Sequence, residues 1–175
     1  MIVFTGVAGS GKSMQGRLLA DEMGYPWLST GEFLRMVVRG ERRKEMLEGS
    51  LLSDDEVIEV VSKVLSLIEV DREFVLDGFP RSEPQAKWLL NQIDKQEFSP
   101  TRVIHMVANK ATVRARLLER GRKDDHPEAI DARFDEYEEA IRPILDMFRE
   151  QDISVIDIDA EQDIEVIHQQ IKKAI

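Results

Sequence analysis

The chain of 175 residues contains no cysteine. It therefore cannot build a disulfide framework, a thiol nucleophile or a zinc site made of thiolates. Its three histidines, His105, His126 and His168, are far apart along the chain, which disfavours a histidine metal site. We expect His105 to be a half-buried strand residue, and His126 and His168 to lie at surface or cap positions.

Long apolar runs are also missing. No stretch approaches the ~20 apolar residues that span a bilayer, and the first residues lack the basic leader of a signal peptide. The chain has no Gly/Ser linker and no internal repeat. We therefore expect a single domain over residues 1–175, located in the cytoplasm, without a membrane partner and monomeric by default.

Basic residues are the minority charge. The chain has 24 lysines and arginines against 34 acidic residues, a net charge of −10. This argues against a nucleic-acid partner, because nucleic-acid binders usually carry a basic face or stripe. It also means that a protein of this composition must gather its arginines locally if it binds an anionic substrate.

What the chain does contain is an alternation of short apolar runs with longer helical stretches. This pattern is typical of βα units on a parallel sheet. The candidate strands are Ile2–Thr5, Trp27–Ser29, Phe74–Asp77, Val103–Val107 and Val155–Ile158. We predict an α/β fold of three layers with a five-stranded parallel sheet and a ligand site at the carboxyl edge of its strands.

Several helical features have clear signatures. Met14, Leu18, Leu19 and Met23 recur at helical spacing and predict one buried face of the first helix. Residues 53–56 form a capping box, Ser-x-x-Glu, ahead of an apolar helix.

Two further segments predict less regular helices. Pro143 interrupts a helical run over residues 127–148, so we expect a kink or a break there. The charged segment Arg39–Gly49 predicts a small helical excursion at the edge of the core.

The strongest motif covers residues 6–13, Gly-Val-Ala-Gly-Ser-Gly-Lys-Ser, which match the complete pattern G-x-x-x-x-G-K-[ST]. It follows the first strand and opens the first helix, which is the context that this phosphate-binding loop requires. The backbone of Gly9, Ser10 and Gly11 can wrap phosphate oxygens at a helix N-terminus. Lys12 can reach the β- and γ-phosphates, and the Ser13 hydroxyl can ligate Mg²⁺. The fold class is therefore P-loop NTPase-like.

Three more segments narrow the class. Residues 28–35 read Leu-Ser-Thr-Gly-Glu-Phe-Leu-Arg, and residues 74–81 read Phe-Val-Leu-Asp-Gly-Phe-Pro-Arg with Gln85 one turn later. Residues 116–125 are rich in arginine, and Arg133 follows in the next helix. Together with the phosphate loop, these segments resemble the adenylate kinase family over nearly the whole chain.

The resemblance implies transfer of the γ-phosphoryl group of ATP-Mg²⁺ to AMP, which gives two ADP. It implies AMP-binding residues, which are Thr30, Arg35, Leu52, Gly78, Arg81 and Gln85. It implies an ATP site formed by Gly9, Ser10, Gly11, Lys12, Ser13, Met14 and Arg116. The catalytic residues would be Lys12, Arg81, Arg120, Arg122 and Arg133. Mg²⁺ would be held by Ser13 and by Asp77, which closes an apolar strand as a Walker-B-like acid does.

The chain departs from the family pattern in two loops. Gly121 alone separates Arg120 from Arg122, so the lid at about residues 120–123 is vestigial. The excursion that folds over the monophosphate, at about residues 30–53, is short. These departures leave open a nucleotide-binding protein without turnover. A UMP or CMP kinase is the other alternative, although those relatives tend to carry Ala in place of Thr30 and Asn in place of Gln85.

Overall fold

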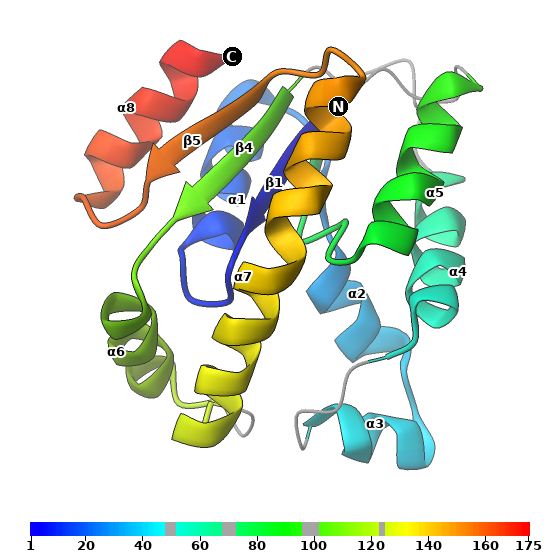
Figure 1. The fold of residues 1–175 in the computed structure, drawn as a ribbon, viewed down its shortest axis with the longest axis vertical. Coiled ribbons are helices and arrows are strands. Elements are labelled where there is room, and N and C mark those ends of the chain that lie inside the picture. The colour runs from blue at the N-terminus through cyan, green and yellow to red at the C-terminus, as the bar shows by residue number, and fades with distance from the viewer. Residues whose placement is uncertain (48–51, 68–72, 96–101, 123–124) are drawn as a thin grey trace.

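The computed structural model describes residues 1–47, 52–67, 73–95, 102–122 and 125–175. Its centre is a five-stranded sheet in which every neighbouring pair is parallel (Figure 1). The order across the sheet is β2-β3-β1-β4-β5. The strands are β1 (Ile2–Gly6), β2 (Trp27–Ser29), β3 (Val75–Asp77), β4 (Arg102–Val107) and β5 (Val155–Asp159). The predicted sheet is confirmed.

The helices of the described chain connect these strands. They are α1 (Lys12–Met23), α2 (Thr30–Val37), α3 (Gly40–Leu47), α4 (Asp54–Leu65), α5 (Glu83–Asp94), α6 (Lys110–Arg120), α7 (Pro127–Glu150) and α8 (Ile164–Ala174). The capping box is present, with Ser53 as the N-cap of α4 and Glu56 as its third residue. The predicted excursion is helical up to Leu47, and its end at Gly49 lies outside the described residues.

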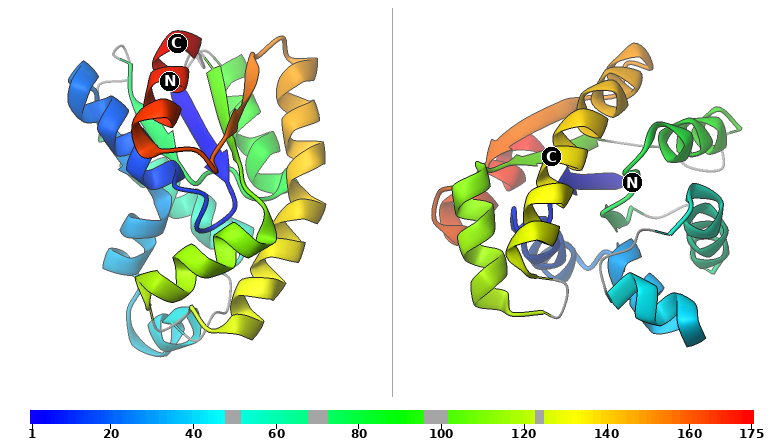
Figure 2. Two further views of the ribbon diagram at one scale, coloured as in Figure 1. Left: turned by 90° about the vertical axis from the view of Figure 1, so that its left-hand side faces the viewer. Right: turned by 60° about the horizontal axis from the view of Figure 1, so that its bottom comes forward.

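Two apolar clusters join the three layers, one on each face of the sheet. Alternation along β1 sends Val3 to one face, where it packs with buried residues of α4, α5 and α7. Ile2 and Phe4 point to the other face, where they pack with residues of α1 and α8. Figure 2 shows these helices on the two sides of the sheet. The predicted three-layer α/β fold is therefore confirmed.

The carboxyl ends of the strands place the sequence motifs next to one another. Phe4 of β1 is level with Asp77 of β3, and Asp77 is level with Ser29 of β2. The turns that follow β1, β3 and β2 therefore leave the sheet at the same edge, as parallel pairing requires. α6 and the start of α7 lie on one side of this edge and α2 and α3 on the other (Figure 2, right).

The expected apolar face of α1 is correct for Leu19, which is fully buried, but wrong for the other three residues. The helix buries Gln15, Gly16, Leu19 and Ala20, whereas Met14, Leu18 and Met23 are 52%, 40% and 44% exposed. Gln15 is buried because its side-chain amide donates to the carbonyl oxygen of Ile164 at 2.8 Å. The buried side of α1 thus contains a polar residue and a glycine. The spacing of apolar residues alone cannot identify such a face.

Two further expectations are corrected. α7 is continuous through Pro143, so the expected break does not occur, and the alternative, a kink, stays a prediction. A proline removes one backbone donor, and the buried Ile141, Ile144 and Leu145 on either side of it hold the helix against the core. His168 is 7% exposed, not at the surface, because its Nε2 pairs with Glu22 of α1 at 2.8 Å. His105 is half-buried and His126 caps α7, as expected.

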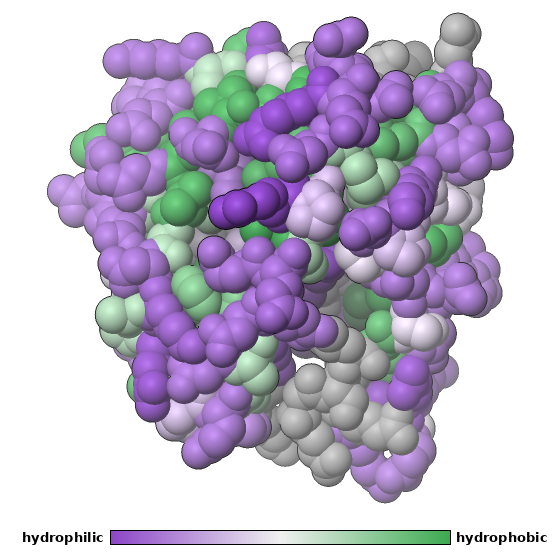
Figure 3. Space-filling model, in the orientation of Figure 1, coloured by the Kyte–Doolittle hydropathy of each residue, from purple (hydrophilic) through white to green (hydrophobic). Residues whose placement is uncertain are grey.

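The outer surface over α7 carries several of the acidic residues. The face formed by α7 is mostly hydrophilic (Figure 3), and the helix carries exposed acids such as Glu136, Glu138 and Glu139. None of the described helices is long and apolar enough to cross a membrane.

The corrected face of α1 can be tested by two adjacent substitutions. Leu19→Ala should lower the free energy of unfolding by about 2–5 kcal/mol, because a fully buried leucine leaves a cavity. Leu18→Ala, one residue away and partly exposed, should lower it by less than about 1 kcal/mol. Urea denaturation followed by tryptophan fluorescence measures both. Equal losses would mean that α1 buries the face that periodicity predicts.

Candidate phosphate-binding site

The loop between β1 and α1 wraps closely onto its neighbours. Gly9 has φ +89°, and a Cβ there would lie 2.9 Å from Cγ of Leu117 on α6, so only glycine fits. Gly11 immediately precedes α1, and no side chain of the described residues caps that helix. Its first N–H groups are therefore available to an anion, and the helix dipole adds positive partial charge. This is the geometry that the motif predicts.

Lys12, the first residue of α1, lies among positive charges from three other segments. Removal from solvent lowers the pKa of Lys12 from 10.5 to about 8. Asp77 opposes that shift, and the charges of Arg81, Arg120 and Arg35 add to it. Three arginines that are distant in sequence thus lie within electrostatic range of one lysine. This gathering is what a protein of net charge −10 needs in order to bind an anion.

Arg35 of α2 and Arg81, which follows β3, approach the same backbone. A Cβ at Gly31 would lie 3.4 Å from a terminal nitrogen of Arg35 and 3.6 Å from one of Arg81. Gly78, with φ +78°, leaves room for the Arg81 guanidinium, which would lie 2.9 Å from a Cβ at that position. The Nε of Arg81 donates to the Gly78 carbonyl oxygen at 2.7 Å. Two guanidinium groups so arranged suit a doubly charged phosphate.

Arg120, at the end of α6, is held in place by a buried acid. Its Nε and Nη2 donate to the two carboxylate oxygens of Asp125 at 2.8 and 2.7 Å. The Asp125 side chain is 0% exposed, and it also accepts from the backbone N–H of Arg122 at 3.1 Å. Arg133 of α7 approaches the same carboxylate at 4.0 Å. Burial alone would raise the pKa of Asp125, but these bonds and charges lower it below its ordinary value.

This anchoring leaves Arg120 able to bind a second anion. A guanidinium has five N–H groups, and the side-on pair with Asp125 uses one on Nε and one on Nη2. Both N–H groups of Nη1 and one of Nη2 remain, and they form the end-on fork that binds phosphate oxygens.

Asp77 and Ser13 were predicted to hold a metal ion, and their surroundings suit one. Asp77 is 1% exposed at the end of β3. Its Oδ1 has no hydrogen-bond partner among the described residues, which is costly for a buried carboxylate oxygen unless a ligand or water satisfies it. Ser13 is exposed on the first turn of α1. Mg²⁺ typically takes one or two protein oxygens and keeps several waters, so this sparse donor set fits that ion.

Gln85 of α5 is buried and hydrogen-bonded at both ends of its amide. Its Oε1 accepts from the backbone N–H of Arg81 at 2.9 Å, and its Nε2 donates to Oδ1 of Asp54 at 2.7 Å. The hydroxyl of Ser82 donates to the same Asp54 oxygen at 2.6 Å. The sequence predicts Gln85 as a residue of the site, but it does not predict the partner on α4.

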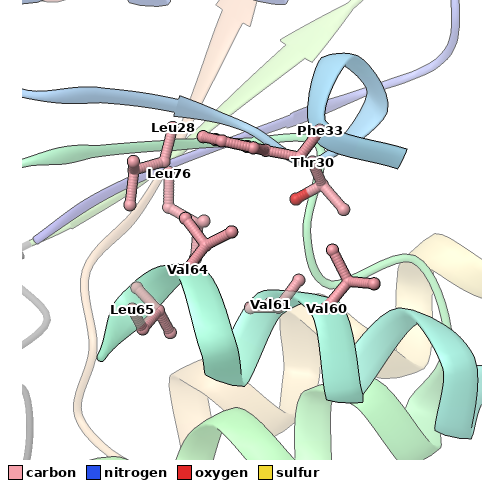
Figure 4. A pocket seen from close by; sticks show the side chains of 8 residues that line it. All are labelled: Leu28, Thr30, Phe33, Val60, Val61, Val64, Leu65 and Leu76. Atoms are coloured by element: carbon pink, nitrogen blue, oxygen red, sulfur yellow. The ribbon is translucent and has the colours of Figure 1, made fainter. Parts of the chain in front are cut away.

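Thr30 points into a small apolar cavity between α2, α4 and the sheet (Figure 4). Its Oγ1 is buried without a hydrogen-bond partner among the described residues. The lining residues besides Thr30 are Leu28, Phe33, Val60, Val61, Val64, Leu65 and Leu76. The free volume is about 10 Å³, which holds one water molecule at most. A purine ring could enter only if α2 and α4 moved apart.

The remaining predicted residues are less tightly placed. Leu52 is partly buried against the core beside α4. Arg116 is half-buried on α6, one turn before Arg120, and Arg122 is exposed after the end of that helix. Met14 is exposed next to Ser13 in an open groove that Glu32 of α2 also lines.

Two acids of the site, Asp125 and Asp54, had no role in the predictions from sequence. Asp125 stands three residues after Arg122, and a carboxylate within an arginine-rich string could have been expected to pair with it. Asp54 follows the capping-box serine, where an acid is ordinary at a helix N-terminus. Nothing in the local sequence connects it to Gln85, which is 31 residues away.

Comparison with known proteins agrees with this geometry. The family model described as adenylate kinase matches residues 4–153. An adenylate kinase of Rhizobium meliloti is 34% identical over 148 residues, which covers 75% of this chain and 77% of the relative. Adenylate kinase 1 of a Nostoc species is 35% identical over 138 residues, covering 75% of each chain. An adenylate kinase of Agrobacterium fabrum is 34% identical over 148 residues.

The lowered pKa of Lys12 predicts proton uptake on binding ATP. Near pH 7 the amine is protonated with or without ligand. Near pH 9 the free protein has largely lost that proton, and a bound phosphate chain draws it back, so about one proton is taken up. ATP affinity should therefore weaken as the pH rises through about 8.

Calorimetry in two buffers of different ionisation enthalpy measures this uptake, with Lys12→Ala as the control that lacks the titrating group. An affinity that is independent of pH over this window, with no proton uptake, would contradict the prediction.

Proposed function

Because this chain belongs to the adenylate kinase family, we propose that it transfers the γ-phosphoryl group of ATP to AMP and releases two ADP. The observation that supports this most directly is the convergence of Arg35, Arg81 and Arg120 on Lys12. The four side chains come from separate segments, and together they can hold phosphates on both sides of the lysine. The relatives named adenylate kinase support the same reaction.

On the donor side, the backbone of Gly9, Ser10 and Gly11 and the start of α1 at Lys12 would bind the triphosphate, with Ser13 and Met14 next along the helix. Arg116 would stack on the adenine. The oxygens of Ser13 and Asp77 would hold Mg²⁺, directly or through water. When bound, that ion would supply positive charge that neutralises the phosphates of ATP.

On the acceptor side, the guanidinium groups of Arg35 and Arg81 would hold the AMP phosphate beside Gly78. Thr30, Leu52 and Gln85 would border the adenine. Since the cavity beside Thr30 is too small for a base, AMP binding would separate α2 from α4. The unpaired hydroxyl of Thr30 would then gain a partner, which favours the open, ligand-bound arrangement.

Transfer between these two subsites requires positioning more than covalent help. An oxygen of the AMP phosphate attacks the γ-phosphorus, and the bond from that phosphorus to the bridging oxygen of the β-phosphate breaks. Lys12 and the guanidinium groups of Arg81, Arg120, Arg122 and Arg133 would stabilise the negative charge of the transferring group, which is the main source of rate in such reactions. No general base is needed.

The alternatives are less well supported. A UMP or CMP kinase would not need the pair Thr30 and Gln85. A binding protein without turnover would not need the repulsion that the gathered cations impose on Lys12. The cytoplasmic location and monomeric state expected from the sequence stay predictions.

The reaction is tested by following ADP formation from ATP with AMP, UMP and CMP in turn. AMP should be the preferred acceptor. Lys12→Ala should lower turnover at least about 10³-fold, which is the scale of removing one phosphoryl-binding cation. Arg17→Ala is the matched control, because it removes an exposed cation from the same helix and should leave turnover unchanged. Preference for UMP or CMP, or no ADP formation with any acceptor, would refute the proposal.

The Asp125 carboxylate predicts a second effect on turnover. Asp125→Asn should release Arg120 and lower kcat about 100-fold, since small displacements of positioned groups cost that much. Asp131→Asn is the matched control, because Asp131 also pairs with an arginine of α6, Arg114, at 3.2 Å but not with a proposed catalytic residue. Steady-state kinetics below the melting temperature of both variants separates the effect from unfolding. Equal losses of kcat would show that Asp125 serves only to join the helices.

A further inference from the structure

The amide of Gln85 can lie in only one orientation. Its Oε1 faces the N–H of Arg81, which only donates, and its Nε2 faces the carboxylate of Asp54, which accepts when ionised. If the amide were flipped, two donors would meet at Arg81 and two acceptors would meet at Asp54. Hydrogen-bond capacity thus decides an assignment that shape alone leaves ambiguous.

Asp54 is itself held in place. Its Oδ1 accepts from both Gln85 and the hydroxyl of Ser82. Ser82 caps α5, and its oxygen accepts from the backbone N–H of Gln85 at 3.4 Å. Asp54 is the first residue of α4, whose N-cap Ser53 bonds Glu56 in the capping box. The carboxylate therefore joins the starts of two helices.

The locked amide keeps one free group of each kind. An amide nitrogen has two N–H groups and a carbonyl oxygen has two lone pairs, so one donor and one acceptor remain after these bonds. Adenine presents a complementary edge, with a donating 6-amino group beside the accepting N1. Hypoxanthine has the same size but the reversed edge, with an accepting O6 beside a donating N1–H. An amide free to rotate could pair with either base, whereas a locked one matches only the first.

We infer that Asp54 is a specificity-determining residue, which fixes the Gln85 amide so that the acceptor site takes 6-aminopurine monophosphates and rejects 6-oxopurine ones. The inference rests on the proposed function, because it assigns the acceptor base to Gln85. Asp54 acts through Gln85 and is a positioning residue, not a catalytic one. Cytosine also has an amino group beside an acceptor nitrogen, so the fixed amide does not distinguish CMP from AMP. Size and the cavity beside Thr30 must separate those two.

The test compares AMP with IMP as acceptors, using the full-length protein and ATP. Asp54→Ala should lower the ratio of kcat/KM for AMP to that for IMP at least about tenfold, the loss expected when a hydrogen bond to a charged group is removed. The KM for ATP should stay unchanged. Asp55→Ala is the matched control, because it removes an exposed acid from the next position of the same helix terminus and should leave the ratio as in the parent.

Each outcome has a separate meaning. If the parent protein does not phosphorylate AMP, the proposed function fails before any variant is considered. If the parent uses AMP but Asp54→Ala keeps the parental ratio, or Asp55→Ala shifts it equally, the inference on Asp54 is overturned and the reaction stands. Should Asp54→Ala not fold, Asp54→Asn retains size and can offer Gln85 either a donor or an acceptor. It should lower the ratio to an intermediate value, and an unchanged ratio would equally overturn the inference.

Discussion

Positive charges that must lie side by side are the constraint on which the rest of this structure depends. Lys12 is surrounded by Arg35, Arg81 and Arg120, and both this repulsion and desolvation lower its pKa. Without ligand, such a cluster is unfavourable unless acids lie within it. Asp77 supplies one on the sheet side, and Asp125 supplies another beside Arg120. Both are almost completely buried, so their charges act at close range, where the dielectric is low.

The parallel sheet is what allows cations so distant in sequence to meet. β1 lies between β3 and β4, so the segments that follow β2, β3, β1 and β4 leave the sheet at one edge. Arg35, Arg81, Lys12 and Arg120 each come from a different one of these segments. These four residues are therefore close in space although they are distant in the sequence. The exposed acids of α7, such as Glu136 and Glu139, add negative charge without changing this local gathering of cations, which a chain of net charge −10 needs in order to bind an anion.

The two sides of the site are held by carboxylates with different tasks. Beside α6, Asp125 accepts from Nε and Nη2 of Arg120 and leaves the N–H groups of Nη1 available for phosphate. Beside α4, Asp54 accepts from the Gln85 amide and fixes the direction in which its oxygen and nitrogen point. The arrangement beside α6 orders Arg120 through a buried carboxylate. The small cavity beside Thr30 lies between α2 and α4 (Figure 4), so the proposed binding of the acceptor base would require these helices to separate.

The sequence by itself determined the phosphate loop, the strands, the capping box of α4 and the family, because each depends on residues that are adjacent or regularly spaced. Only the tertiary structure decided which side of α1 is buried, since a contact of Gln15 with α8 outweighs the apolar spacing of Met14, Leu18 and Met23. Packing on both sides of Pro143 likewise keeps α7 continuous, and the contact between α1 and α8 buries His168, whose Nε2 pairs with Glu22. The roles of Asp54 and Asp125 also come from the fold. A carboxylate's partner is whichever donor the fold brings within hydrogen-bonding distance, and for Asp54 that donor lies on another helix, beyond the reach of any local pattern.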